Sequence, residues 1–313
     1  MILTVTPNPS LDRTYEVRTL DRGAVLRATA DRVDPGGKGV NVSRAIAAAG
    51  GRTTAVLPLG GPPGTLLAAL LADRGVDVTV VSIAGQTRSN ISLAEPDGTL
   101  TKINAAGPAL TPEEAALLLA TVRGHASAAG WVAGCGSLPP GPAGTWYAEL
   151  VAAAHAVGAR AALDTSGPAL LDALSAGPDL VKPNAAELAE AVGRPLATLG
   201  DAVKAAEELR DRGAGAVLAS LGADGQLLLD ATGTHYGRAE VPAVRSNVGA
   251  GDASLAGFLL AGGTGPAALA SALAHGAAAV QLPGSVMPTP ADLDPAAVTV
   301  TRELPLDLPL SEG

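Results

Sequence analysis

The sequence has few of the residues that mark several large classes of protein. Its 313 residues include a single cysteine, Cys135, which rules out an intrachain disulfide and argues against a cysteine-based zinc site. Aromatic residues make up only 2% of the chain, so the core must consist mainly of Ala, Leu and Val. The apolar runs are short and interrupted by glycine or charge, whereas a bilayer-spanning helix needs roughly 18 or more apolar residues. We therefore predict no membrane-spanning segment.

Positive charge is also in short supply. Twenty-one Lys and Arg residues face 30 Asp and Glu residues, which gives a formal net charge of -9. This balance argues against a general nucleic-acid-binding protein, which needs a basic face. It does not argue against a small anionic substrate, because such a molecule responds to the local field. The opening residues MILTVTPNPS lack the basic and long apolar regions of a signal peptide, so we expect a cytoplasmic protein.

What the chain does have is enough apolar residues to bury a sizeable core: 47% are hydrophobic and the mean hydropathy is +0.29. Against a background rich in Ala, Gly, Pro and Arg, lysine and asparagine are rare. The only lysines are Lys38, Lys102, Lys182 and Lys204. In such a background, a lysine is expected mainly where its chemistry is needed.

Strands and helices are predicted to alternate along the chain. Short apolar runs predict strands at residues 1–5, 55–59, 76–83, 131–135, 160–163, 179–181 and 216–219. Helical spacing predicts helices at 65–74, 111–122, 143–157, 168–175, 185–192, 200–212, 250–262 and 266–281. This alternation is typical of an α/β fold with a mostly parallel sheet covered on both faces.

Three segments depart from this alternation. Residues 226–241 alternate around Gly233 and predict an antiparallel hairpin. Residues 11–33 and 87–103 carry alternating polar residues and predict a separate small sheet over one end of the main sheet. The chain after about residue 288 is rich in Pro and Asp, and we expect little regular structure in its last ten residues.

The chemically rich segments fall where predicted strands end. They are NPSLD, DPGGKGVN, GSLPPG, LDTSG, VKPN and SLGADG. In open α/β sheets, ligands bind outside the carboxyl ends of the strands. This coincidence favours an enzyme over a structural protein.

The segment NVGAGD at residues 247–252 precedes an apolar helical run. Small residues at a helix start expose backbone N–H groups that can bind an anion. Asp252, in the first turn, could act as a general base for attack on a phosphoryl group. The alternative is that Asp252 only caps the helix, and the segment alone does not decide between the two.

The segment DPGGKGVN at residues 34–41 is a second glycine-rich turn before a helix. It is not a Walker A loop, because Gly follows Lys38 and the first glycine is wrongly spaced. Lys38 offers a point charge, and Asn41 offers both donors and an acceptor. The alternative is a plain turn with a surface lysine, which the rarity of lysine disfavours.

The segment KPNAAE at residues 182–187 also has two interpretations. Asn184 can cap the next helix, with Glu187 completing a capping box. Alternatively, Asn184 and Glu187 hold Mg²⁺, directly or through water, near ATP phosphates. The spacing fits both.

Other candidates carry weaker signals. Arg88 is a plausible phosphate-binding residue, although it could also be an exposed strand residue. The four histidines have no paired spacing, so we assign them no metal. Cys135, Trp131, Trp146 and Phe258 are expected to be core residues.

In combination and in their order along the chain, these motifs resemble those of PfkB-type, ribokinase-like carbohydrate kinases. The matching motifs are NPSLD, GGKGVNVSRA, GSLPPG, VKPNAAE, SLGADG and NVGAGD. The matching segments lie between about residues 8 and 260. The resemblance implies an αβα sandwich with a small β-sheet lid, ATP with Mg²⁺, and phosphoryl transfer to a sugar hydroxyl. It also implies a single kinase domain over 1–313, lid strands from about 11–33 and 87–104, and a homodimer formed through the lid.

The same resemblance assigns roles to individual residues. Asp252 matches the family's catalytic base. The family's anion hole is matched by Gly249, Ala250 and Gly251. ATP phosphates and Mg²⁺ are expected at Lys182, Asn184 and Glu187, with the nucleotide at Ser220, Gly222 and Gly225. The sugar or sugar phosphate is expected at Asp12, Gly37, Lys38, Asn41, Arg88, Asn90, Asn104 and Ser137.

Within the family, the chain most resembles the branch that acts on hexose phosphates. A substrate that already carries a phosphate needs extra cations, here Lys38 and Arg88. Members that act on fructose 6-phosphate tend to have Gly in place of Lys38 and a lid Lys where this chain has Val25. We therefore expect conversion of fructose 1-phosphate to fructose 1,6-bisphosphate. The alternatives are tagatose 6-phosphate or fructose 6-phosphate as substrate, or a non-catalytic sugar-phosphate sensor.

Overall fold

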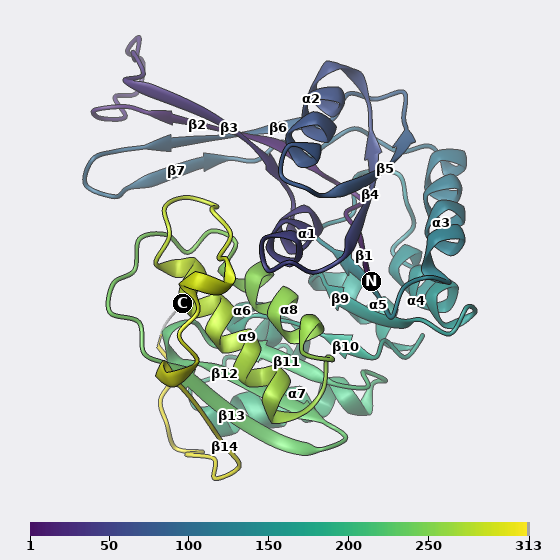
Figure 1. Cartoon of the computed structure of the whole chain (residues 1–313), viewed down its shortest axis with the longest axis vertical. Helices are drawn as coiled ribbons and strands as arrows, with labels where there is room; N and C mark the ends of the chain where they lie inside the picture. Colours follow the sequence, from purple (N-terminus) through teal and green to yellow (C-terminus); the bar gives the residue numbers. More distant parts are fainter. Residues whose placement is uncertain (312–313) are drawn as a thin grey trace.

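The computed structural model describes residues 1–311 and contains two sheets (Figure 1). The larger sheet has ten strands, in the spatial order β14 (Val298–Thr301), β13 (Gly233–Ala239), β12 (Gln226–Asp230), β11 (Val217–Ser220), β10 (Leu180–Val181), β9 (Arg160–Asp164), β8 (Trp131–Cys135), β1 (Ile2–Val5), β4 (Thr53–Leu59) and β5 (Asp77–Ser82). From β11 to β5 every neighbouring pair is parallel, and β12, β13 and β14 extend the sheet antiparallel. The predicted α/β class with a mostly parallel sheet is confirmed.

Helices cover both faces of this sheet (Figure 1). The core cluster on one face includes residues of α3 (Pro112–Ala126), α4 (Trp146–His155), α5 (Gly167–Leu174), α6 (Ala185–Val192) and α7 (Leu199–Asp211). The clusters on the other face include residues of α1 (Lys38–Ala48), α2 (Gly61–Ala72), α8 (Ala250–Leu260) and α9 (Gly265–Val280). Three short 3-10 turns lie at Gly222–Asp224, Pro290–Asp292 and Pro295–Ala297. The core is built largely from Ala, Leu and Val, as the shortage of aromatic residues requires.

The smaller sheet has the order β3 (Ala30–Gly36), β2 (Ser10–Glu16), β6 (Arg88–Ala94) and β7 (Leu100–Ile103). It projects from the main body beyond α1 and α2 (Figure 1). We call this sheet the lid. Residues paired across neighbouring strands point to the same side of a sheet, and the lid therefore has two different faces. Asp12 and Asn90 share one face, whereas Tyr15, Leu93 and Ile103 share the other.

Several predicted boundaries differ from the structure by a few residues, and one strand was not predicted. Helix α2 begins at Gly61, four residues before its expected start, because prolines fit the first turn of a helix, where N–H groups need no intrahelical partner. Strand β14 was not expected in the Pro- and Asp-rich region after residue 288. It exists because it pairs with β13 at the edge of the sheet, a contact that local sequence does not specify. The expected lack of regular structure from residue 304 holds as far as residue 311, and residues 312 and 313 lie outside the described part.

The predicted hairpin is present as β12 and β13, which meet at Gly233. Among residues 1–311, no helix is both long enough and apolar enough to cross a bilayer.

Candidate active site

Several polar side chains meet at the carboxyl edge of the parallel strands. Asp164 is the last residue of β9, and Lys182 follows β10. Helices α1 and α8 begin beside this edge and carry Asn41 and Asp252 in their first turns. The fold therefore brings together residues that are up to 211 positions apart, as the Asn41–Asp252 hydrogen bond shows.

Asp252 is a buried carboxylate held by one side chain. Nδ2 of Asn41 donates to its Oδ2 at 2.9 Å. Burial and the neighbouring Asp164 carboxylate raise the pKa of Asp252 to about 6. A carboxylate with this pKa is ionised at neutral pH and more basic than an ordinary aspartate, which suits a general base. No hydrogen bond to the start of α8 engages it among the described residues, so the simple capping interpretation is not supported.

The start of α8 is arranged to receive an anion. Gly249, at the N-cap, has a φ of +80°, a conformation that glycine adopts without strain. Since glycine has no side chain, it does not cap the first-turn N–H groups. A Cβ on Gly251 would lie 3.4 Å from Nζ of Lys182, so an ammonium group borders the same turn. Together, the free amides and this ammonium favour a negatively charged ligand.

Asp164 links two lysines beside this anion site. Its Oδ1 lies 2.7 Å from Nζ of Lys38, and its Oδ2 lies 2.9 Å from Nζ of Lys182. Asp164 is fully buried, which would raise its pKa, but the two ammonium groups outweigh burial and lower it. Asp164 is not among the site residues predicted from the sequence. Its only signal was the segment LDTSG at the end of a predicted strand.

The ammonium group of Lys38 is already neutralised by carboxylates. Besides Asp164, it lies 3.0 Å from Oε1 of Glu187. Burial lowers the pKa of Lys38, but the two carboxylates more than compensate and raise it above its usual value. The alternative of a plain turn with a surface lysine is not supported, because this partly exposed lysine belongs to a charge cluster. Its assignment to the sugar phosphate stays a prediction.

Asn184 and Glu187 form the capping box that the sequence allowed. Oδ1 of Asn184 accepts from the Glu187 amide at 2.8 Å, and the Asn184 amide donates to Oε2 of Glu187 at 2.9 Å. The box occupies the side-chain oxygen of Asn184 and one carboxylate oxygen of Glu187, and Lys38 holds the other oxygen of Glu187. Among residues 1–311, no group of three or more His, Cys, Asp or Glu residues could hold a metal ion.

Asn184 and Glu187 therefore fit Mg²⁺ in only one way. The ion would be held mainly by water and by nucleotide phosphate oxygens, with few protein carboxylates, as is common for Mg²⁺ bound with nucleotides. Glu187 would then hold the hydrated ion through water, in the orientation that its capping box with Asn184 fixes.

The predicted nucleotide residues lie next to this cluster. Asn184 forms a parallel bridge with Ser220, which ends β11. The turn that follows is closed by the Leu221 amide, which donates to the carbonyl oxygen of Gly225 at 2.8 Å. A Cβ on Gly222, with a φ of +63°, would meet nothing within 4 Å, so this turn has open space beside it.

The predicted sugar residues of the lid form a network at its base. Oδ1 of Asp12 accepts from Ser10 Oγ at 2.7 Å and from Asn90 Nδ2 at 3.0 Å. Burial raises the pKa of Asp12, although these hydrogen bonds oppose the shift. A Cβ on Gly36 would overlap the Asp12 carboxylate, so a side chain at this position would displace that carboxylate.

Arg88 spans the neighbouring backbone. Its Nη1 donates to the carbonyl oxygen of Ala105 at 2.6 Å, and its Nη2 donates to that of Asn8 at 2.9 Å. Its Nε is buried without a partner among the described residues. Asn104 and Ser137 lie exposed on the segments after β7 and β8, and Gly37 is the N-cap of α1.

The residues expected to be structural are buried. Cys135, Trp131, Trp146 and Phe258 are at most 4% exposed. Burial raises the pKa of the Cys135 thiol far above its usual value, so this cysteine is not a nucleophile.

Comparison with known proteins agrees with this geometry. A family model described as pfkB family carbohydrate kinase matches residues 6–292. The 1-phosphofructokinase of Rhodobacter capsulatus is 39% identical over 307 residues, covering 96% of both chains. The ATP-dependent 6-phosphofructokinase isozyme 2 of Escherichia coli is 38% identical over 262 residues, covering 83% of this chain and 84% of that protein.

A solved structure shows the same fold. The phosphofructokinase-2 of Escherichia coli in complex with potassium superposes with a TM-score of 0.88 at 35% identity, covering 93% of this chain and 96% of the other. This superposition covers nearly the whole chain and shows the same fold. The chain belongs to the pfkB family of carbohydrate kinases and is a phosphotransferase with an alcohol acceptor.

Proposed function

We propose that this enzyme, working in the cytoplasm, transfers the γ-phosphoryl group of ATP to the C6 hydroxyl of fructose 1-phosphate and forms fructose 1,6-bisphosphate. The observation that carries the proposal is the buried Asp252 carboxylate, whose pKa is raised to about 6 at the start of an uncapped helix. A base and an anion site are thereby adjacent, as phosphoryl transfer to a hydroxyl requires.

Asp252 accepts the proton of the substrate hydroxyl as its oxygen attacks the γ-phosphorus, and ADP leaves with the electrons of the broken P–O bond. Asn41 keeps the carboxylate in position through its 2.9 Å hydrogen bond. The first-turn amides of Gly249, Ala250 and Gly251, together with Lys182, stabilise charge on the transferring group. Mg²⁺ bound to ATP would neutralise charge on the β- and γ-phosphates.

The sugar phosphate lies between this edge and the lid in the proposed complex. Asp12 and Asn90 bind sugar hydroxyls, and Arg88 binds the phosphate. Fructose 1-phosphate is favoured over 6-phosphates because of one position in the lid. Members that act on fructose 6-phosphate tend to carry a lysine there, whereas this chain carries Val25, which is 85% exposed. Val25 offers no cation to a phosphate at that end of the sugar.

The test of the proposed substrate is a comparison of ADP release from Mg-ATP with fructose 1-phosphate, fructose 6-phosphate and tagatose 6-phosphate. We expect the highest kcat/KM on fructose 1-phosphate. A preference for either 6-phosphate would overturn the substrate assignment and keep the base and the anion hole. Absence of turnover on all three would contradict catalysis of this reaction altogether.

Lys38 and Arg88 should have separable roles. Since Lys38 contacts Asp164 beside the anion site, we place its charge next to the transferring phosphoryl group. Replacement by Met should lower kcat about tenfold or more with a smaller change in the KM of the sugar phosphate. Arg88→Gln should mainly raise that KM, by about tenfold or more, because a charge-assisted hydrogen bond is lost.

Steady-state kinetics of both variants test this, with Arg123→Gln on an exposed part of α3 as the control. If Lys38→Met raises only the KM of the sugar phosphate, Lys38 binds the sugar phosphate, as the sequence resemblance alone implied.

We also propose that the lid joins two copies of the chain. Its face away from Asp12 carries Tyr15, Ile91, Leu93 and Ile103 beside Arg13, and Ile103 is 57% exposed. Apolar side chains gathered on one face of a projecting sheet are typical of an interface. Ile103→Asp should therefore convert dimers to monomers in light scattering coupled to size exclusion. Lys102→Asp, on the opposite face, should remain dimeric, and a monomeric parent protein would contradict the proposal.

A further inference from the structure

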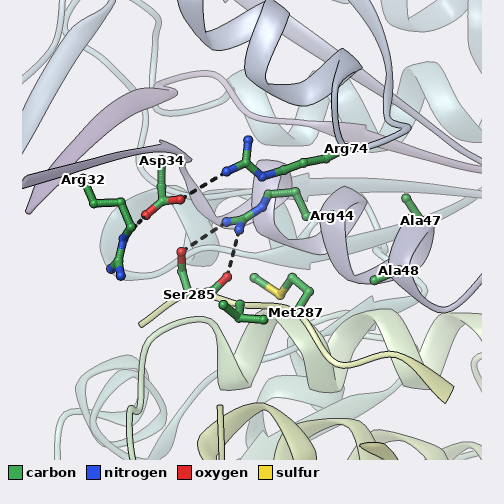
Figure 2. A pocket seen from close by; sticks show the side chains of 9 residues that line it. Arg32, Asp34, Arg44, Ala47, Ala48, Arg74, Ser285 and Met287 are labelled. Carbon is green, nitrogen blue, oxygen red and sulfur yellow. Dashed lines mark hydrogen bonds and ion pairs between the residues drawn. The ribbon is translucent and has the colours of Figure 1, made fainter. Parts of the chain in front are cut away.

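A cavity lies farther along α1, and the proposed reaction does not account for it. It has a volume of about 350 Å³. Arg44, Ala47 and Ala48 of α1 form one wall, Arg32 and Asp34 of β3 and Arg74 after α2 form another, and residues 285–287 close it. Figure 2 shows the three arginines around the single acidic residue, Asp34.

The cavity holds more positive than negative charge, in a chain whose net charge is -9. Asp34 is shared, since its Oδ2 lies 2.6 Å from Nε of Arg32 and its Oδ1 lies 3.3 Å from Nη2 of Arg74. Arg44 has no carboxylate partner within ion-pair distance among the described residues. Burial and, to a smaller extent, the charge of Arg74 lower the pKa of Arg44, and the carboxylates of Asp34, Asp12 and Asp252 oppose the shift.

Donor groups remain available in the cavity wall. Within residues 1–311, neither terminal nitrogen of Arg32 has a protein acceptor. Nε of Arg44 also lacks a partner among those residues, but it is fully buried and therefore cannot contact a ligand in the cavity. Nη2 of Arg44 makes one hydrogen bond, to the carbonyl oxygen of Ser285 at 2.8 Å, and so has a second N–H to offer.

The arrangement of these donors favours one kind of anion. A planar carboxylate is matched by a single guanidinium fork, whereas the tetrahedral oxygens of a phosphate can accept from several directions. Here the guanidinium groups come from three separate elements. Ala47, Ala48, Val286 and Met287 supply an apolar side that suits a short carbon skeleton.

We propose that this cavity binds the phosphate group of a small phosphorylated metabolite at a site separate from the catalytic edge. Arg44 lies between the two sites, since its Nη1 donates to Oδ1 of Asn41 at 3.0 Å while its Nη2 holds Ser285. The proposed ligand is a phosphate monoester with a body of a few carbon atoms. It rests on the cavity and its charges, and does not depend on which sugar is the substrate.

The test is calorimetric titration of the intact protein with glycerol 3-phosphate and, separately, with inorganic phosphate. Mg-ADP is present in excess to fill the nucleotide part of the catalytic site, and Arg88→Gln reports on its sugar-phosphate part. We expect binding that weakens about tenfold or more in Arg32→Gln/Arg74→Gln and is unchanged in Arg88→Gln. Tighter binding of glycerol 3-phosphate than of inorganic phosphate would assign the site to a monoester, and equal binding would assign it to free phosphate.

Asp34→Asn should change the affinity for the phosphate probe in the opposite direction. Removing the only carboxylate of the cavity should tighten binding about threefold or more, which unfolding cannot mimic. The proposal is overturned if wild-type protein binds neither probe under these conditions. It is equally overturned if binding disappears in Arg88→Gln and survives in Arg32→Gln/Arg74→Gln, because the phosphate would then occupy the catalytic site.

Discussion

Asp252→Asn is expected to lower kcat by roughly 10²- to 10⁴-fold while leaving the KM values for both substrates nearly unchanged. The amide has almost the same shape as the carboxylate but cannot accept the proton of the substrate hydroxyl. In the parent enzyme, kcat/KM should fall as the pH drops through about 6, where Asp252 becomes protonated. Steady-state kinetics between about pH 5 and pH 8 measure both effects.

The same substitution should stabilise the protein at neutral pH. The pKa of Asp252 in the folded chain is raised from 3.8 to about 6, so ionisation opposes folding. The stability that the protonated form contributes is complete below the unfolded pKa and is lost as the pH rises through about 6. Asp252→Asn should therefore gain about 1 to 3 kcal/mol of unfolding free energy at pH 7.5, and less near pH 4.

Thermal unfolding at both pH values checks this gain, with Asp211→Asn at the exposed end of α7 as the control. Retention of most of the turnover in Asp252→Asn would remove Asp252 from the role of base. A lower melting temperature at pH 7.5 would show that the ionised carboxylate is a net stabilising group.

Asp164→Asn is expected to destabilise the fold strongly, by about 3 to 5 kcal/mol. It removes the carboxylate that lies between Lys38 and Lys182, and Lys182 is only 4% exposed, so its ammonium would stay buried without a counter-charge. Because the pKa of Asp164 is lowered in the fold, this stability is present above the unfolded pKa near 3.8 and is lost as the pH falls below it. Denaturant unfolding at pH 7.5 measures the loss.

The matched variants identify the cause. Lys38→Met leaves the Asp164–Lys182 pair intact and should cost much less, because Lys38 is partly exposed. Asp164→Asn/Lys182→Met removes both charges and should recover much of the stability lost in Asp164→Asn. If the double variant is as unstable as Asp164→Asn, the loss comes from packing and not from an unpaired charge.

Local patterns predicted most elements, because apolar periodicity and turn residues act within a few positions of the chain. The strand at Trp131–Cys135 and the helix at Ala185–Val192 lie where the sequence placed them. Strand β14 was missed because an edge strand is defined by its partner β13. The lid sheet was predicted as a separate unit from its polar alternation, and its strand order was not.

The sequence by itself determined the family, the glycine-rich turns and the candidacy of Asp252, because these depend on residue types at fixed short spacings. Only the tertiary structure brought Asp164 between Lys38 and Lys182, and only it gathered three arginines around one cavity. The same is true of the raised pKa of Asp252, which comes from burial and from Asp164. Charge interactions depend on distance and burial in space, and neither can be read along the chain.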